Sequence, residues 1–256
     1  MPEFASYPSL RDAPIVISGG AAGIGEALVR NFAAQGAKVG FVDVADEAGQ
    51  QLAAELKGQG QIVRFTRCDV TDTTAYQAAI EGFATAHGDA RVLVNNAAYD
   101  ERHDWADVTP ELWDQRIAVN LKHAFFAIQA VAPAMVAAKK GSIINMGSIS
   151  WMIMSPRIPI YETAKAAAHG LTRSMARELG KSGVRVNTLA PGWIMTERQM
   201  SRWLDAESEK WLEESQTLAG RVYPDDVARM VLFLAADDSA MISAQDFLVD
   251  GGWAHA

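Results

Sequence analysis

Short apolar runs alternate with longer amphipathic segments along the whole chain, and glycine, proline or polar residues separate them. Apolar runs bounded by turn residues are typical of buried strands, whereas the segments between them have the spacing of helices. The regular alternation predicts an α/β fold in which helices cover both faces of a parallel, doubly wound, Rossmann-type sheet. Seven strands are predicted, at residues 15–17, 38–42, 62–66, 92–95, 142–146, 185–189 and 245–249.

The composition is that of one globular domain. Of the 256 residues, 49% are hydrophobic and 21% charged, which is enough to bury one large core, and no change in composition marks a second domain. We therefore predict a single domain over residues 1–256. The net charge of −8 is spread along the chain and would repel nucleic acid and anionic membranes.

Cysteine content and the first residues bear on the compartment. Cys68 is the only cysteine, so no intrachain disulfide can form. No apolar leader follows residues 1–4, and no uncharged apolar run reaches the ~18 residues of a membrane span. We expect a cytoplasmic protein that binds neither nucleic acid nor a membrane.

A glycine-rich turn follows the first predicted strand directly. Gly19, Gly23 and Gly25 stand between that strand and an apolar helical pattern. Glycine lets the backbone turn tightly and approach a ligand, and the free N–H groups at a helix start attract a pyrophosphate. The spacing Gly-x-x-x-Gly-x-Gly differs from the commonest dinucleotide fingerprint, so by itself it fits a plain turn equally well.

An acidic residue, Asp43, stands at the carboxyl end of the second predicted strand, where dinucleotide-binding sheets place the group that contacts the adenosine ribose. Its carboxylate would accept hydrogen bonds from both ribose hydroxyls and repel a 2′-phosphate, and no arginine or lysine follows at once to neutralise one. The alternative is an aspartate that caps the next helix, a role that Asp46 fits too. Together with the glycine turn, Asp43 favours NAD over NADP.

Tyr161 and Lys165 lie one helical turn apart in a segment with a helical pattern, which places both on one face. A free tyrosine ionises near pH ~10, and a nearby ammonium favours the phenolate and lowers the pKa. The pair could then transfer protons at neutral pH. A packed ring beside a solvated amine has the same spacing, so the pair needs support from other motifs.

With these motifs the chain resembles the short-chain dehydrogenase/reductase family over nearly its whole length. The resemblance implies a catalytic tetrad of Asn120, Ser148, Tyr161 and Lys165. One departure is Ala98, where the family's Asn-Asn-Ala-Gly motif has glycine. The cofactor residues that the resemblance implies are Gly19, Gly23, Ile24, Gly25, Asp43, Asp69, Val70, Asn96, Ala97, Tyr161, Lys165, Pro191, Gly192, Ile194 and Thr196.

The resemblance also assigns roles within the tetrad. Tyr161 takes the proton of the alcohol, and Ser148 hydrogen-bonds the reacting oxygen. Lys165 supports the phenolate and holds the nicotinamide ribose, while Asn120 positions a water that links Lys165 to solvent. For Asn120 a buried helix amide bonded to backbone is an open alternative, and Asn96, like its neighbour Asn95, could mainly tie strands together.

A narrower resemblance, to NAD-dependent aldose 1-dehydrogenases of the D-xylose, L-arabinose and galactose type, rests on short segments at 7–10, 102–103, 147–151, 161–165 and 196–199. It implies oxidation of a sugar's anomeric hydroxyl to a lactone. A sugar needs a flat apolar surface and hydrogen-bonding groups around its hydroxyls. The substrate residues predicted on this basis are Ser148, Trp151, Tyr161, Arg102, His103, Trp193 and Gln199.

Some of these substrate roles have plain alternatives. Trp151 could pack in the core, and Arg102 and His103 could belong to a solvated loop. His103 has no neighbouring cluster with metal-site spacing, so we predict no metal. Residues 193–221 combine tryptophans and methionines with many charges, which predicts short amphipathic helices that form a substrate lid or a packing surface.

Family resemblance implies a homotetramer. Two other functions stay open at this point. The chain could be a short-chain dehydrogenase for another secondary alcohol or ketone, such as a polyol, a hydroxysteroid or a 3-oxoacyl thioester. It could also be a protein that senses NAD without turnover, although the intact set Ser148, Tyr161 and Lys165 argues against that function because binding alone needs no proton transfer.

Overall fold

The structure, a computed structural model, describes residues 4–254. All seven predicted strands are confirmed, and they form one sheet with the order β3-β2-β1-β4-β5-β6-β7 in which every pairing is parallel. The order reverses between β1 and β4, and ligands bind beyond the carboxyl ends of the strands at such a point. The strands are β1 (Pro14–Ser18), β2 (Lys38–Asp43), β3 (Val63–Arg67), β4 (Val92–Asn95), β5 (Gly141–Met146), β6 (Val184–Pro191) and β7 (Asp246–Val249).

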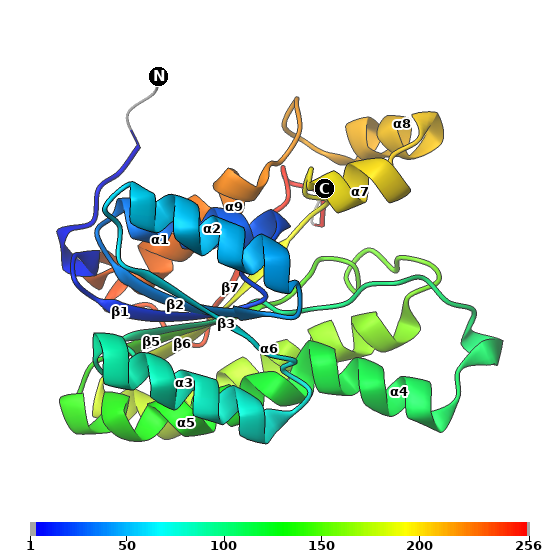
Figure 1. Ribbon diagram of the computed structural model, residues 1–256. Helices are drawn as coiled ribbons and strands as arrows, with labels where there is room; N and C mark the ends of the chain where they lie inside the picture. The colour runs from blue at the N-terminus through cyan, green and yellow to red at the C-terminus, as the bar shows by residue number, and fades with distance from the viewer. Residues whose placement is uncertain (1–3, 255–256) are drawn as a thin grey trace.

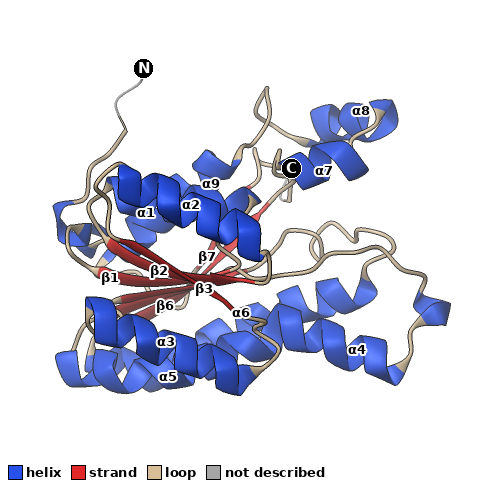
Figure 2. Ribbon diagram, viewed as in Figure 1, coloured by secondary structure: helices blue, strands red, loops and turns tan. Residues whose placement is uncertain are grey.

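Helices cover both faces of this sheet, as the alternation predicts. Helices α1, α2 and α9 lie on one face, and α3, α4, α5 and α6 on the other (Figure 1; Figure 2). The α-helices are α1 (Gly23–Ala34), α2 (Asp46–Gly58), α3 (Thr73–His87), α4 (Pro110–Ile117), α5 (His123–Ala138), α6 (Pro159–Leu179), α7 (Glu197–Arg202), α8 (Ala206–Ser215) and α9 (Pro224–Ala235). A π-helical turn, Ala118–Lys122, joins α4 to α5, and short 3₁₀ turns occupy Pro8–Leu10, Trp105–Asp107, Gly180–Ser182 and Asp237–Ser239.

Two hydrophobic clusters, one on each face of the sheet, explain why β1 and β4 in the middle of the sheet are largely apolar. Side chains alternate along a strand, so Ile15 and Ile17 of β1 pack under α1, whereas Val16 between them packs with Tyr76 of α3. A strand covered on both faces has little surface facing solvent, so its residues are mostly apolar on both sides. A third, smaller cluster of Ile149, Ala190, Met195, Leu212 and Trp253 lies beneath α7 and α8.

The helical stretch Pro110–Ala138 is long and apolar enough to cross a membrane by length and composition alone. A buried helix of a folded domain passes the same test. Ala127, Ile128 and Val131 of α5 lie in the core, where the helix packs on α3, β4 and β5. The apolar side of α5 is thus explained by packing inside the domain.

Short helices in residues 193–221 are confirmed as α7 and α8. Thr196 caps α7 by accepting a hydrogen bond from the backbone N–H of Gln199, and Asp205 and Ser208 form a capping box at the start of α8. Both helices lie at the carboxyl side of the sheet, apart from the helices that cover its faces (Figure 1).

Candidate active site

A cleft of about 1810 Å³ opens beyond the carboxyl ends of the strands. Its lining includes the glycine turn after β1, the end of β2, the segment after β4, the start of α6 and the segment that leads into α7. Every residue predicted to hold the cofactor lines this cleft, as do Ser148, Arg102, Trp193 and Gln199. Asn120, Trp151 and His103 do not line it.

The glycine turn needs its glycines. Gly19 and Gly23 have φ angles of +67° and +57°, in the left-handed region that other residues avoid. A Cβ atom on Gly25 would lie 1.8 Å from the carbonyl oxygen of Gly19. The N-cap residue of α1, Ala22, provides no side-chain cap, so the first N–H groups of the helix face the cleft without a partner from that side chain. A pyrophosphate group fits this cradle.

Asn96 and Asp43 fix the shape of the turn. The Asn96 Nδ2 atom donates to the carbonyl oxygens of Ser18 at 3.0 Å and Gly19 at 2.8 Å, which confirms a strand-tying role for this residue. The Asp43 carboxylate accepts from the N–H groups of Ala21 at 2.9 Å and Ala45 at 3.0 Å. It is therefore anchored at the cleft wall, with acceptor capacity left on both oxygens.

At the adenosine end of the cleft, Val44 is a lining residue that was not predicted from the sequence. Val44, directly after Asp43, is 61% exposed and lines the cleft. Asp69 and Val70 line the same region, with Asp69 held by hydrogen bonds from Thr71. Val44 and Val70 give this end of the cleft apolar surfaces suited to the flat face of the adenine ring. An apolar residue directly after a strand-end aspartate is the signal that could have found Val44.

The start of α6 carries the reactive pair. The Lys165 Nζ atom lies 5.5 Å from the centroid of the Tyr161 ring, and it donates a hydrogen bond of 2.7 Å to the carbonyl oxygen of Met146. Lys165 is buried, and this burial lowers the pKa of its ammonium to about 8. The prediction that Tyr161 and Lys165 lie on one face of a helix is therefore confirmed.

The expected fall in the pKa of Tyr161 is wrong for the chain by itself. Burial, and next the negative charge of Asp100, raise the pKa of the phenol above 10, while Ser148 and Arg198 oppose the rise. The Lys165 ammonium does not act on the phenol oxygen, because it is bonded to the Met146 carbonyl. At neutral pH the phenol of the chain alone is protonated.

Asn120 lies within the π-helical turn and is 4% exposed. Its Oδ1 atom accepts from the N–H of Tyr99 at 2.8 Å, and its Nδ2 atom donates to the carbonyl oxygens of Tyr99 at 3.1 Å and Arg116 at 2.9 Å. All three hydrogen bonds go to backbone, which matches the structural alternative. They fix the loop after β4 where it enters the cleft, and the catalytic role of Asn120 stays a prediction.

Two predicted substrate residues lie elsewhere. The Trp151 Nε1 atom donates to Nε2 of His169 at 3.3 Å, and the other ring nitrogen of His169 lies 2.8 Å from the Asp246 carboxylate. Trp151 therefore packs on α6 outside the cleft lining, and its role as a sugar platform stays a prediction. His103 is held in its loop by the carbonyl oxygens of Glu101 and Arg157. The sequence could not show that Trp151 contacts His169, because the two residues are 18 positions apart and lie on different elements.

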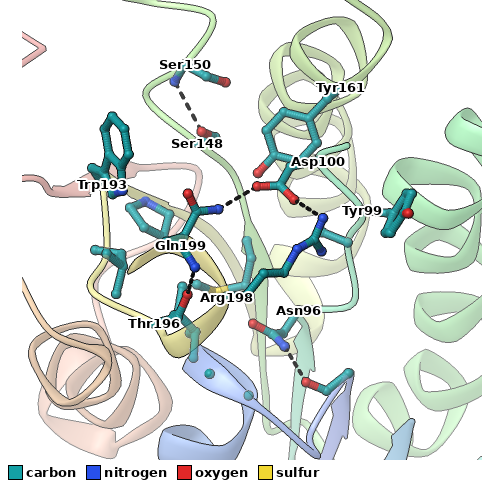
Figure 3. A pocket seen from close by; sticks show the side chains of 18 of the residues that line it. Asn96, Tyr99, Asp100, Ser148, Ser150, Tyr161, Trp193, Thr196, Arg198 and Gln199 are labelled. Carbon is teal, nitrogen blue, oxygen red and sulfur yellow. Dashed lines mark hydrogen bonds and ion pairs between the residues drawn. The ribbon is translucent and has the colours of Figure 1, made fainter. Parts of the chain in front are cut away.

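The substrate end of the cleft is built from side chains of α7 and of the loop after β4 (Figure 3). Gln199 Nε2 donates to the Asp100 carboxylate at 2.7 Å, and Arg198 lies 3.0 Å from its other oxygen. Trp193 packs edge-on against Trp211 with ring centroids 6.3 Å apart. Asp100 and Arg198 were not predicted; for Asp100 the available signal was its place just beyond the end of β4.

Arg102 lines the cleft, but its guanidinium is already engaged. The Arg102 Cζ atom lies 4.3 Å from the centroid of the Trp203 ring, so the side chain stacks on the segment between α7 and α8. Its predicted contact with a substrate hydroxyl stays a prediction.

A phosphate cradle at a helix start, a strand-end aspartate beside it, and a serine, tyrosine and lysine that share the cleft define a nicotinamide-dependent oxidoreductase. A family model described as enoyl-(acyl carrier protein) reductase matches residues 19–254. The chain belongs to the short-chain dehydrogenase/reductase family, whose members act on CH–OH groups with a nicotinamide dinucleotide.

Relatives cover the chain almost completely. It is 46% identical to D-xylose 1-dehydrogenase of Caulobacter vibrioides, over 97% of this chain and 98% of that protein. It is 45% identical to a probable galactose dehydrogenase of Rhizobium meliloti, over 97% of each chain. Among solved structures, a gluconate 5-dehydrogenase from Burkholderia cenocepacia in complex with NADP and tartrate superposes with a TM-score of 0.90 at 31% identity, over 97% of this chain and 98% of that one.

Proposed function

We propose that this protein oxidises the anomeric hydroxyl of an aldose to the aldonolactone and transfers the hydride to NAD. The observation that carries the proposal is the polar substrate end of the cleft. Asp100, Arg198 and Gln199 gather there beside Ser148 and Tyr161, and the indole of Trp193 adds an apolar face (Figure 3). A polyhydroxylated ring needs this combination. The names of the D-xylose and galactose relatives support the same substrate class.

Tyr161 and Ser148 have separate roles in the proposed oxidation. The Tyr161 phenolate takes the proton of the anomeric hydroxyl, and the hydrogen on the anomeric carbon departs as hydride while that carbon becomes the carbonyl of a lactone. Ser148 hydrogen-bonds the reacting oxygen and fixes its distance from Tyr161. When bound, an oxidised nicotinamide supplies a positively charged hydride acceptor. The lactone then opens in water to the aldonic acid.

The raised pKa of Tyr161 sets the direction of the pH dependence. The group must be deprotonated to act as a base, so the rate of oxidation rises with pH until the phenol is ionised. Lys165, whose pKa is lowered to about 8, is mostly cationic below that pH, but its ammonium is bonded to the Met146 carbonyl and is not among the groups that lower the pKa of Tyr161.

The preference for NAD is supported by the charges around the adenosine end. The Asp43 carboxylate is fixed at the cleft wall, where it would repel a 2′-phosphate. Arg30, a cation that lines the cleft, is held by Glu26 at 2.9 Å and by both oxygens of Glu55 at 2.7 Å. These two glutamates occupy the guanidinium, so it is not free to neutralise a phosphate.

A substrate panel tests the proposed function. Purified protein is mixed with NAD and, separately, D-xylose, L-arabinose, D-galactose and L-fucose, and NADH formation is followed by absorbance. A polyol, a hydroxysteroid and, in the reverse direction with NADH, a 3-oxoacyl thioester are the comparison substrates. We expect turnover with at least one aldose and an aldonic acid as product. Turnover of a comparison substrate with none of the aldoses would overturn the proposal.

We also propose that the protein is a cytoplasmic homotetramer whose partners are its cofactor and a small sugar. Trp113 of α4 is 41% exposed and Phe125 of α5 is 45% exposed, so this pair of helices presents apolar surface that a second subunit could cover. Light scattering after gel filtration should give a mass four times that of the 27.7 kDa chain. A mass of one chain would contradict the proposal.

A further inference from the structure

The loop after β4 carries a carboxylate that no predicted role explains. Asp100 follows Tyr99, whose backbone N–H and carbonyl are both bonded to Asn120. The backbone just before Asp100 is therefore held by the buried side chain of Asn120. Its own side chain is 27% exposed and lines the cleft. A carboxylate held rigidly at a cleft wall is suited to recognise a ligand.

Two residues of α7 orient this carboxylate and leave part of it free. Gln199 donates to Oδ2 at 2.7 Å, and the Arg198 guanidinium lies 3.0 Å from Oδ1. An ionised carboxylate has about four acceptor sites, so each oxygen keeps a lone pair for a further donor. Figure 3 shows Gln199 and Arg198 reaching the carboxylate from α7, with the Tyr161 ring nearby.

The negative charge of Asp100 affects the pKa of both reacting groups. It raises the pKa of the Tyr161 phenol and opposes the fall in the pKa of the Lys165 ammonium. The charged groups that face Tyr161 are Lys165 from α6, Arg198 from α7 and Asp100 itself. Glu101 is turned toward Arg198 and Arg202, and Arg116 of α4 lies over the Tyr99 ring.

We propose that Asp100 accepts a hydrogen bond from the sugar hydroxyl next to the reacting one, and so makes the site specific for polyhydroxylated substrates. This inference rests on the proposed aldose oxidation. A substrate with a single alcohol group, such as a hydroxysteroid, would displace water from the Asp100 carboxylate and would not donate a hydrogen bond to replace it. Sites built to bond a substrate hydroxyl reject analogues that lack it, because the buried polar group is left unpaired.

Asp100→Asn tests this role, because it keeps the shape and an acceptor oxygen but removes the charge. For D-galactose we expect kcat/KM to fall about 10- to 100-fold, mostly through KM, since hydrogen bonds to charged groups are strong. The acid limb of the pH profile should move to lower pH, because a negative charge that opposes the phenolate is gone. The Kd for NAD should stay within about twofold of wild type, because Asp100 is not among the residues placed at the cofactor.

The substrate gives a second, independent test. Wild type should prefer D-galactose to 2-deoxy-D-galactose by a factor that Asp100→Asn largely removes, since the variant and the deoxy sugar delete the same contact. Asp104→Asn, the same change in the same loop but at an exposed helix cap outside the cleft, is the matched control and should behave as wild type. Asp100→Ser is the second variant if the asparagine protein does not fold.

The outcomes separate the two proposals. If wild type oxidises aldoses and Asp100→Asn keeps the wild-type KM, pH profile and preference over the deoxy sugar, the role of Asp100 is overturned and the proposed function stands. If neither Asp100 variant folds and binds NAD, Asp100 is a structural residue and its role in specificity is overturned. If wild type oxidises no aldose, both proposals are overturned.

Discussion

At the adenosine end of the cleft the groups that face the ligand are mostly backbone, whereas at the substrate end they are long side chains. The glycine turn presents N–H groups, and only glycine fits at Gly25. The substrate end depends on Asp100, Arg198 and Gln199, which are held by an ion pair and a hydrogen bond between a loop and a short helix. A site made of backbone N–H groups keeps its geometry and its ligand when side chains change. A site made of side chains can change its ligand through amino-acid substitution. One scaffold can therefore keep its cofactor while its substrate changes.

Removal of the Tyr161 hydroxyl should have the largest effect, because the proton acceptor lies where the two ends meet. Tyr161→Phe should lower kcat by about 10²- to 10⁴-fold and leave the Kd for NAD within about twofold, since general base catalysis contributes that much to rate. Steady-state kinetics and a fluorescence titration with NADH measure the two effects. Tyr7→Phe, far from the cleft, is the control. Substantial residual turnover in Tyr161→Phe would remove this residue from the role of base.

A side chain in the backbone-built end should be nearly as damaging. In Gly25→Ala the added Cβ would meet the Gly19 carbonyl at 1.8 Å, so the turn must open. We expect NAD binding to weaken about 100-fold. Gly82→Ala in α3, where the added methyl meets nothing within 4 Å, should instead raise stability by ~0.5–1 kcal/mol. Calorimetric titration and thermal unfolding check both. Normal NAD affinity in Gly25→Ala would mean that the turn does not hold the pyrophosphate.

The strand-end carboxylate should matter less for affinity and more for cofactor choice. Asp43→Ala removes the proposed ribose acceptor and the charge that repels a 2′-phosphate, so kcat/KM with NAD should fall about 10- to 100-fold and the preference over NADP should shrink. Asp46→Ala removes a nearby exposed carboxylate that does not line the cleft and should leave both cofactors unaffected. An unchanged NAD to NADP ratio in Asp43→Ala would assign ribose recognition to another group.

The smallest effect is expected at the ion pairs that hold α7. Glu101 accepts from Arg198 at 3.2 Å and Arg202 at 3.0 Å, and both pairs are partly exposed, so each is worth at most about 1 kcal/mol. Glu101→Gln should raise the KM for sugar about two- to fivefold and speed hydrogen exchange in residues 197–215, more so at low salt. Glu213→Gln, an exposed change in α8, is the control. Unchanged exchange would argue against α7 as part of a lid.

The features that were predicted correctly are local in the sequence. Each strand is one apolar run, the glycine turn is one continuous motif, and the Tyr161–Lys165 pair is one turn of one helix. The features that were missed depend on long-range contacts. Asp100 meets Arg198 and Gln199 across nearly one hundred residues. Trp151 turns toward His169, a partner that appears only when α6 is placed beside β5. The pKa of Tyr161 is raised by burial and by the charge of Asp100, and neither effect can be predicted from the residues next to Tyr161 in the sequence.

The most direct test of the account is the pH dependence of aldose oxidation with NAD, measured as kcat/KM from about pH 5 to about pH 10 in wild type and Tyr161→Phe. If Tyr161 is the base, kcat/KM of wild type rises about tenfold per pH unit on the acid side, through the ionisation of one group, and the variant is slow and lacks this rise. A wild-type rate that does not change with pH, or the same rise in Tyr161→Phe, would contradict it.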